Sequence, residues 1–519
     1  MLGQIDLVIV FIYAVSLFAL AQWVSREKAG HVKDAQDYFL AGRALPWWAI
    51  GASMIAANIS AEQIIGMSGS GFAIGLAIAS YEWMAAITLL LVGKYLLPIF
   101  LKMGIYTMPQ FLEQRYDSRV RTVMAGFWLG VYVFVNLTAI LWLGALAINT
   151  VTGLDLILSM ILLGAFAVTY SLYGGLKAVA FTDIIQVVLL VLGGILIITI
   201  LLQEVSGGAG VFAGFVQVLE AAPEKFDMIL SRDHPYYKSL PGISVLVGGM
   251  WIMNLSYWGF NQYIIQRALA AKSIDEAQKG IAFAAFLKVL MPMIVVLPGI
   301  IMFVLEPDLA VPDQAYPQAM TLLPTGIKGL VFAALLAAIV SSLASMCNSI
   351  STIFTVDLFS RFGHYEMTPA RQVKVGRIVS VSAMLIAMIT AKPLLGNFDQ
   401  AFQYIQEFTG FFTPGIVAIF LLGMFYKPTT ATAALVVAIG SAVLSLAFKL
   451  GLPDLPFIDR VGLVFLMCII VAVVLSHLRP APQIDLLEIN HVDFGTSQVF
   501  NLSAVVVILL VAALYAVWW

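Results

Sequence analysis

Polar residues that could bind a ligand gather in one apolar stretch of the sequence, between Gly51 and Thr88. They are Asn58, Glu62, Gln63 and Glu82. Ionisable side chains in a membrane cost roughly several kcal/mol each unless they are paired or hydrated, so those retained there usually line the path of an ion or a polar substrate. Hydrogen bonds between neighbouring helices explain one such residue. The whole group favours the binding core of a transporter.

A second set of candidate ligands lies on a single helical face further along the chain. Ala338, Ser341 and Ser342 are spaced i, i+3, i+4 within the apolar run 326–358. Two hydroxyls and a backbone carbonyl would give an oxygen-only cage suited to Na⁺. Small residues that let helices pack closely explain the same spacing equally well.

The composition sets the class of protein in which these residues act. Of 519 residues, 61% are hydrophobic and 11% are charged, whereas soluble domains carry about 25% charged residues. The net charge of −2 gives no reason to expect nucleic acid as a partner. No nucleotide loop, metal-ligand spacing or nucleophile motif is present in the sequence. We therefore expect an integral membrane protein that is not an enzyme and needs no cofactor beyond a coupling ion.

Apolar runs of about 20 residues, long enough to cross a bilayer, follow one another along the whole chain. They predict about 14 transmembrane helices in a single domain, 1–519, at 5–25, 46–72, 80–103, 122–149, 157–177, 181–203, 243–265, 280–305, 326–358, 376–394, 400–426, 430–450, 459–478 and 499–518. An even number places both termini on one side. Most Lys and Arg residues then lie in loops opposite the termini, so the positive-inside rule predicts N- and C-termini outside the cytoplasm.

One of these helices is expected to be interrupted. Residues 55–61 are mostly small, and Asn58 and Ser60 compete for backbone hydrogen bonds, so the helix can open there and expose carbonyl oxygens. Secondary transporters coordinate cations at such breaks, commonly within an inverted repeat. The spans in 46–203 and 243–426 start from opposite sides of the membrane, as an inverted repeat requires.

Several motifs resemble those of a known family. Tyr170-Ser171-Leu172-Tyr173-Gly174-Gly175-Leu176-Lys177-Ala178 resembles the signature of the sodium:solute symporter family, and GFNQYIIQRALAAKS (259–273) is similar to that family's following segment. GASMIAANISAEQIIGMSGSG and QAFQYIQEFTG (400–410) resemble its sugar cotransporters. The resemblance implies an all-α LeuT-type 5+5 inverted repeat, with one extra N-terminal helix (5–25) and three extra C-terminal helices (430–519).

The resemblance also implies a function. It indicates a Na⁺-coupled symporter that imports a hexose, galactose or glucose, by alternating access across a bacterial inner membrane. A Na⁺- or H⁺-coupled carrier of another small polar solute is the alternative. A membrane-bound substrate sensor is disfavoured, because no soluble relay module is fused to the chain.

The family's functional residues map onto positions of this sequence. The sodium ligands would be the carbonyls of Ala56, Ile59 and Ala338 and the hydroxyls of Ser341 and Ser342. The sugar-binding residues would be Gln63, Glu82, Asn254, Tyr257, Lys288 and Gln406. The gate and support residues would be Asn58, Met67, Tyr81, Trp258 and Phe402. Asp183 would lie on the ion exit path, although an Asp that caps a helix start explains it equally well.

Three features of the sequence refine the expected substrate and stoichiometry. Glu82 and Lys288 are opposite charges on different spans and would be costly if left unpaired. Ala344 and Ser345 supply only part of a second sodium site, which predicts one Na⁺ per sugar. Family members that carry galactose have a serine three residues after the glutamate, where this chain has Ala85, so a hexose is a safer prediction than galactose.

Overall fold

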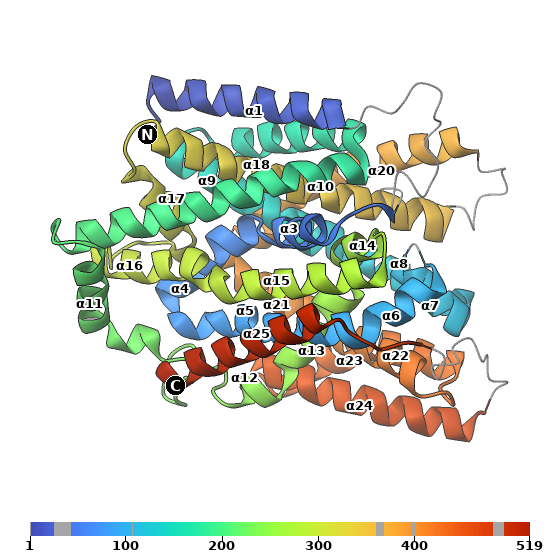
Figure 1. The fold of residues 1–519 in the computed structure, drawn as a ribbon. Helices are drawn as coiled ribbons and strands as arrows, with labels where there is room; N and C mark the ends of the chain where they lie inside the picture. Colours follow the sequence, from blue (N-terminus) through green and yellow to red (C-terminus); the bar gives the residue numbers. More distant parts are fainter. Residues whose placement is uncertain (1, 25–42, 106, 360–367, 397–399, 481–491) are drawn as a thin grey trace.

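The structure is a computed structural model that describes residues 2–24, 43–105, 107–359, 368–396, 400–480 and 492–519, without the side chains of 18, 21–24, 172–184, 369 and 370. The described residues are helical, apart from loops and an isolated bridge between Leu45 and Ala271. The long helices run roughly alongside one another, and both termini lie at the same end of the bundle (Figure 1). This arrangement agrees with an even number of membrane crossings.

Within the described residues, nine helical segments are long and apolar enough to cross a membrane. They are Leu76–Met103, Ser118–Thr152, Ile185–Val205, Ile274–Leu305, Ile327–Phe359, Arg371–Leu395, Ala431–Gly451, Phe457–Leu478 and Gln498–Val517. The helices α21 (Ala401–Thr409) and α22 (Thr413–Phe425), bent by 46°, form a tenth if they count as one span. The other predicted spans fall on α1 (Gln4–Val24), on the first half of α10 (Leu156–Val205) and on two interrupted helices. The total of 14 stays a prediction.

The helix predicted at 46–72 is interrupted where the sequence indicated. It consists of α3 (Trp47–Asn58), the π-helical turn η2 (Glu62–Gly66) and α4 (Met67–Ala73). Ile59, with ψ near 81°, leaves the helical conformation and ends α3. Almost every residue from Ala49 to Ala73 is buried, so the break lies inside the protein, where its backbone groups can bind a ligand.

A second interruption lies at the corresponding position of the second half, in the span predicted at 243–265. There α13 (Gly249–Leu255) continues into the π-helical η7 (Ser256–Phe260), and Asn261 adopts an extended conformation before α14 (Gln262–Leu269) begins. Asn261 accepts a hydrogen bond from the Tyr132 hydroxyl, which in turn accepts one from the Gln262 N–H at 3.1 Å. These bonds satisfy polar groups at the break.

The remaining elements complete the bundle. In the first half they are η3 (Leu76–Ala79), α5 (Ser80–Leu91), η4 (Val92–Leu96), α6 (Leu97–Met103), α7 (Met108–Arg115), α8 (Ser118–Val131), η5 (Tyr132–Leu137), α9 (Thr138–Thr152), α11 (Val211–Ala221) and η6 (Pro223–Phe226). In the second half they are α12 (Ser244–Val247), α15 (Ile274–Val295), α16 (Leu297–Leu305), η8 (Pro312–Gln314), α17 (Ala315–Thr321), α18 (Ile327–Thr352), η9 (Ile353–Phe359), α20 (Pro369–Leu395), α23 (Ala431–Gly451), α24 (Phe457–Leu478) and α25 (Gln498–Val517).

One predicted boundary is not seen as a break in the helix. The spans expected at 157–177 and 181–203 fall within the single helix α10, which is 50 residues long. Straight, such a helix would measure about 75 Å, more than twice the roughly 30 Å of a bilayer's hydrocarbon core. The predicted boundary lies among residues whose side chains are outside the description.

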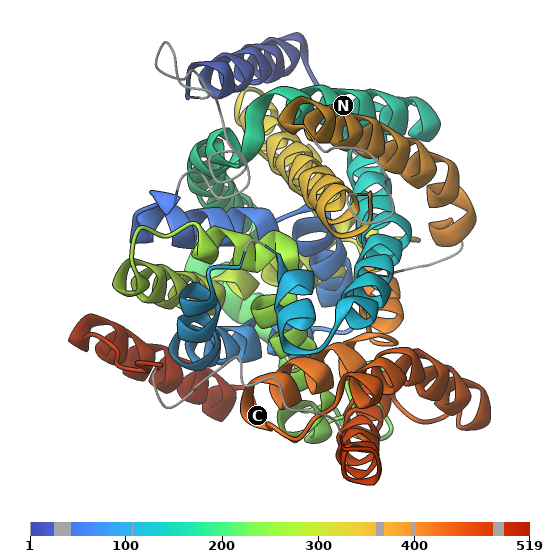
Figure 2. The same cartoon turned by 90° about the vertical axis from the view of Figure 1, so that its right-hand side faces the viewer.

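Burial separates a core from a periphery. In α18, 89% of the most apolar window is buried, against 22% in α25. α18 packs against α1, α3 and α10. Figures 1 and 2 place α1 and α24 on opposite flanks of the molecule. A helix that is apolar all round and buried lies in the core, so α18 belongs with the interrupted α3 at the centre.

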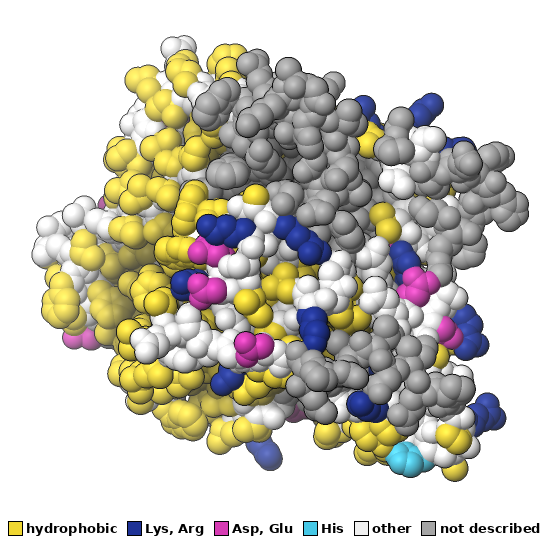
Figure 3. Space-filling view, turned by 45° about the vertical axis from the view of Figure 1, so that its right-hand side comes forward, with side chains coloured by type: hydrophobic (Ala, Val, Ile, Leu, Met, Phe, Trp, Pro, Cys, Tyr) yellow, Lys and Arg dark blue, Asp and Glu magenta, His cyan; other side chains and the backbone are white. Residues whose placement is uncertain are grey.

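The surface has the character of a membrane protein. Figure 3 shows hydrophobic side chains over one flank, with Lys and Arg toward the end opposite the termini. Exposed residues on α1 such as Leu7 and Phe11, 54% and 70% exposed, contribute to the apolar surface of the molecule. An apolar flank next to a charged end fits a bilayer and its aqueous boundary.

The segment 204–242, between α10 and α12, is partly inserted into the bundle. Lys225 of η6 is buried, and its Nζ donates to the carbonyls of Phe72 and Ala73 at 3.0 and 2.8 Å. Burial lowers the pKa of Lys225, although nearby Glu224 opposes this. The Lys225 ammonium group thereby caps the C-terminal end of α4, where the helix dipole favours a cation.

Candidate binding site at the interrupted helix

The charges predicted at membrane depth form a buried ion pair. Lys288 Nζ of α15 lies 2.5 Å from Glu82 Oε2 of α5, and the two side chains are 0% and 5% exposed. Gln63 Nε2 donates to the other oxygen of Glu82, and Lys288 also donates to Asn58 Oδ1. A buried pair of this kind is stable only when further hydrogen bonds satisfy both charges. The side chains beside the helix break supply those bonds.

Aromatic residues of the second interrupted helix flank this ion pair. Asn58 Nδ2 donates to the Tyr257 hydroxyl at 3.0 Å. The Tyr257 and Tyr263 hydroxyls are 2.5 Å apart. Lys288 Nζ lies 5.0 Å from the ring centre of Trp258, within cation–π range. Asn58, one of the predicted gate and support residues, therefore holds Tyr257 through a hydrogen bond.

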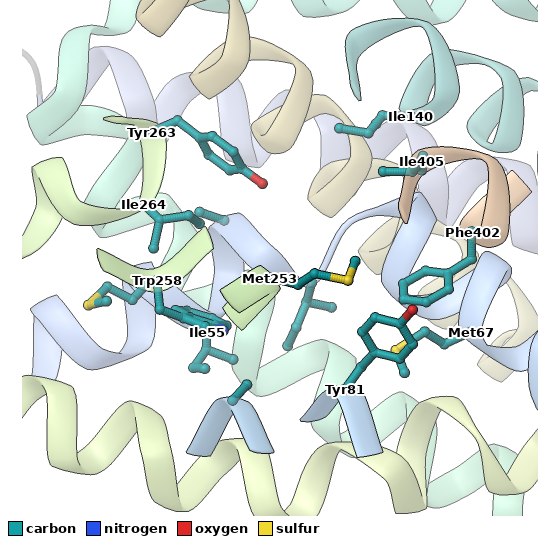
Figure 4. Close-up of a cluster of buried hydrophobic side chains, with 14 of the residues drawn as sticks. Ile55, Met67, Tyr81, Ile140, Met253, Trp258, Tyr263, Ile264, Phe402 and Ile405 are labelled. Atoms are coloured by element: carbon teal, nitrogen blue, oxygen red, sulfur yellow. The ribbon is translucent and has the colours of Figure 1, made fainter. Parts of the chain in front are cut away.

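The other predicted gate residues lie across the cavity from Trp258. The rings of Tyr81 and Phe402 meet edge to face with centres 5.1 Å apart. Met67 contacts Gln63, whose Nε2 lies 2.6 Å from the sulfur. Figure 4 shows Tyr81, Phe402 and Met67 grouped together, with Met253 and Trp258 approaching from the other side.

A cavity of about 50 Å³ lies between these two groups. It is lined by Asn58, Glu62, Gln63, Tyr81, Glu82, Met253, Asn254, Tyr257, Trp258, Phe402 and Gln406. Most of the predicted sugar-binding and gate residues thus line one cavity, and Lys288 and Met67 contact its lining. Pockets for small molecules usually measure about 300–1,000 Å³, so this cavity is small for a ligand site.

Two lining residues, Glu62 and Met253, are not among the sugar-binding and gate residues that the family resemblance implied. Glu62 was recognised as polar at membrane depth, and its Oε2 is buried without a hydrogen-bond partner among the described residues. Its position directly before Gln63 is the signal that could have assigned it to the site. Met253 gave no signal, because an apolar residue in an apolar span is expected to pack against its neighbours.

Backbone oxygens at the helix break have lost their helical hydrogen bonds. The Ser60 N–H, which would bond to Ala56 O in a continuous helix, donates to Asn58 O at 2.8 Å instead. The Gln63 N–H likewise donates to Ser60 O at 3.1 Å rather than to Ile59 O. The carbonyls of Ala56 and Ile59 are thereby released from their helical hydrogen bonds, as the sequence predicted.

The serine helix α18 packs against α3, the helix that ends at the interruption. Ala338, Ser341 and Ser342 are each at most 1% exposed. The Ser342 hydroxyl oxygen has no hydrogen-bond partner among the described residues. The described residues contain no group of three His, Cys, Asp or Glu suited to a metal ion. Neutral oxygen ligands suit a hard cation such as Na⁺. The side chain of Asp183 lies outside the described residues, so its predicted role is untested.

An interrupted helix with released carbonyls beside a polar cavity is characteristic of secondary transporters with inverted repeats. Comparison with known proteins agrees. The model of the sodium:solute symporter family matches residues 38–440. The chain is 49% identical to the sodium/glucose cotransporter of Vibrio parahaemolyticus, over all of this chain and 99% of that protein.

Solved structures give the same result. The substrate-bound, outward-open structure of a Na⁺-coupled sialic acid symporter superposes with a TM-score of 0.81 at 26% identity, over 93% of this chain and 99% of that one. The nucleobase-cation symporter Mhp1, 13% identical with a TM-score of 0.56 over 91% of this chain and 99% of that one, shares the fold. The chain belongs to the sodium:solute symporter family. It has the LeuT-type fold, and it is a multi-pass Na⁺-coupled transporter and not an enzyme.

Proposed function

We propose that this symporter imports a hexose, galactose or glucose, together with one Na⁺. The observation that carries the proposal is the group Glu82, Lys288, Gln63 and Asn58, which offers hydrogen-bond donors and acceptors between aromatic walls. Sugar hydroxyls need both donors and acceptors, and charge-assisted hydrogen bonds are the strong ones. The similarity to a relative named as a sodium/glucose cotransporter supports the same substrate class.

Sugar binding would have to separate the ion pair. In this structure Glu82 and Lys288 form an ion pair with each other. A hexose that enters would exchange this contact for its own hydroxyls, while Gln63, Asn254 and Gln406 supply further hydrogen bonds and Tyr257 stacks against the ring. Tyr81, Phe402 and Met67 would cover the sugar from the other side. Glu82 and Lys288 would thus keep hydrogen-bond partners both with and without bound sugar.

The sodium ligands that we propose are the carbonyls of Ala56, Ile59 and Ala338 and the hydroxyls of Ser341 and Ser342. Their burial, the released carbonyls of α3 and the unpartnered Ser342 hydroxyl support this set. We also propose that 46–203 and 243–426 are the two inverted repeats, that Asp183 lies on the ion exit path, and that the protein resides in a bacterial inner membrane with its termini outside the cytoplasm.

Uptake into proteoliposomes tests the substrate and the ion together. Labelled galactose or glucose should accumulate when an inward Na⁺ gradient is imposed, and the accumulation should collapse when Na⁺ is equal on both sides. A matched experiment with a proton gradient and no Na⁺ should give only passive entry. Proton-driven accumulation, or Na⁺-driven uptake of an unrelated solute but of neither hexose, would overturn the proposal.

The stoichiometry is a separate prediction. One Na⁺ that crosses about 100 mV supplies roughly 2.3 kcal/mol, and a tenfold concentration gradient adds about 1.4 kcal/mol. Together these limit accumulation of a neutral sugar to about 500-fold, and two ions would square that ratio. The membrane potential at which sugar flux reverses, under fixed gradients, should fit one charge per sugar. A fit to two charges would mean that Ser345 and Asp183 complete a second site despite Ala344.

A further inference from the structure

Arg267 is a fully buried cation outside the cavity described above. It lies on α14 with 1% of its surface exposed. Its Nε donates to the Ser53 hydroxyl at 2.8 Å, its Nη2 donates to the Ser345 hydroxyl at 3.1 Å, and its Nη1 donates to the Tyr263 carbonyl. Because removing a charge from water costs roughly several kcal/mol, the position is unfavourable for a residue that only fills space.

Tyr263 connects Arg267 to the proposed sugar site. The Tyr263 hydroxyl lies 2.5 Å from that of Tyr257, and Tyr257 accepts a hydrogen bond from Asn58. Asn58 accepts in turn from Lys288, which is paired with Glu82. Contacts between polar groups therefore run from the buried ion pair to the helical turn that Arg267 holds.

The two serines connect Arg267 to the proposed sodium site. Ser53 lies three residues before Ala56 on α3, and Ser345 lies three and four residues after Ser342 and Ser341 on α18. Residues with these spacings share a helical face. The guanidinium thus joins the two helices that would hold Na⁺, one turn away from the proposed ligands.

We propose that Arg267 is the positioning residue through which Na⁺ binding organises the sugar site. The inference rests on the proposed function. Na⁺ held between α3 and α18 fixes the separation of Ser53 and Ser345, and the planar guanidinium, with donors in a rigid fork, reaches both only at that separation. When it does, it also holds the first turn of α14, where Tyr263 orients Tyr257 beneath the sugar. Arg267 touches neither ion nor sugar.

A role as a simple cross-link makes a different prediction. Loss of a cross-link would weaken sugar binding equally with and without Na⁺, or would lower thermal stability alone. Loss of a coupling residue reduces the ratio between the sugar dissociation constants without Na⁺ and at saturating Na⁺, which measures the coupling between the two sites.

The test is labelled-hexose binding to the purified full chain, with and without Na⁺, for Arg267→Gln, Arg267→Lys and Tyr263→Phe. We expect the ratio to fall at least tenfold in Arg267→Gln. Arg267→Lys should also lower it, because an ammonium keeps the charge but loses the fork. Tyr263→Phe should lower it to a smaller extent. Ser349→Ala, one turn beyond Ser345 on α18, is the matched control and should keep the wild-type ratio.

An unchanged ratio in the Arg267 variants and in Tyr263→Phe would overturn the inference. If the Arg267 variants do not fold, Tyr263→Phe and Ser345→Ala decide the question, since each removes a single hydroxyl. A wild-type protein that binds hexose without any effect of Na⁺ would instead refute the proposed function. A wild-type effect of Na⁺ that the variants retain refutes only the role of Arg267.

Discussion

The buried polar groups on the two sides of the α3 interruption differ in whether they have partners within the protein. On the side of the cavity, charged and amide side chains satisfy one another, as Glu82 does with Lys288 and Gln63. On the side of α18, backbone carbonyls and the Ser342 hydroxyl are left available for a ligand. One side is a network of satisfied polar groups, and the other holds the oxygen atoms that we propose as cation ligands.

The difference follows from the ligands that we propose. A neutral sugar offers donors and acceptors of its own, so it can replace contacts within a network that is already satisfied. A small cation offers only charge, so its site must hold acceptors whose other partners have been removed. Burial without a partner costs about 1–3 kcal/mol per polar group, which Na⁺ would recover on binding.

The largest effect is expected from substitutions in the Glu82–Lys288 ion pair. Glu82→Ala or Lys288→Ala should abolish hexose binding. Because each leaves an uncompensated buried charge, each should also lower stability by about 3–5 kcal/mol. Hexose binding and thermal unfolding in detergent measure the two consequences. The double variant Glu82→Gln/Lys288→Met separates them, since it removes both charges with little change in volume and should restore stability without restoring binding. Normal binding by the double variant would show that the ion pair is structural.

A smaller effect is expected from substitution of a proposed sodium ligand. Ser342→Ala removes one proposed ligand, and an interaction of a polar group with a charge contributes about 1.5–3 kcal/mol. The Na⁺ concentration for half-maximal uptake should therefore rise at least about tenfold, while sugar binding at saturating Na⁺ stays close to that of the wild type. Ser349→Ala, two turns along the same helix, should leave the Na⁺ dependence unchanged. An unaltered Na⁺ dependence in Ser342→Ala would mean that the sodium site lies elsewhere.

The smallest effect concerns the choice between hexoses. Ala85 is buried on α5, one turn after Glu82, although it does not line the cavity in this conformation. Ala85→Ser would add a hydroxyl near the charge pair, and one hydrogen bond contributes about 1 kcal/mol. We expect galactose to gain roughly fivefold over glucose in competition for uptake. Ala86→Ser places the same hydroxyl one residue away and should not change the preference. Equal gains for both sugars would indicate a general change in packing.

The sequence by itself determined the class of protein and indicated both the interrupted helix and the serine face of α18. Apolar runs indicated the helices because a bilayer fixes their length and composition. The small residues around Asn58 indicated the interruption because the competition of Asn and Ser with backbone hydrogen bonds is local. The spacing of Ala338, Ser341 and Ser342 defined a helical face for the same reason. Such properties depend on neighbours within a few residues.

Only the tertiary structure decided how these parts meet. The partners in the network are far apart in the chain: Asn58 and Tyr257 are separated by 199 residues, Lys288 and Glu82 by 206, and Arg267 and Ser53 by 214. The structure placed Glu62 and Met253 in the lining of the cavity, located the second interruption at Asn261 and joined Arg267 to both α3 and α18. A buried charge takes its partner from whichever helix packs beside it, and helix packing is a property of the whole fold, which local sequence patterns do not encode.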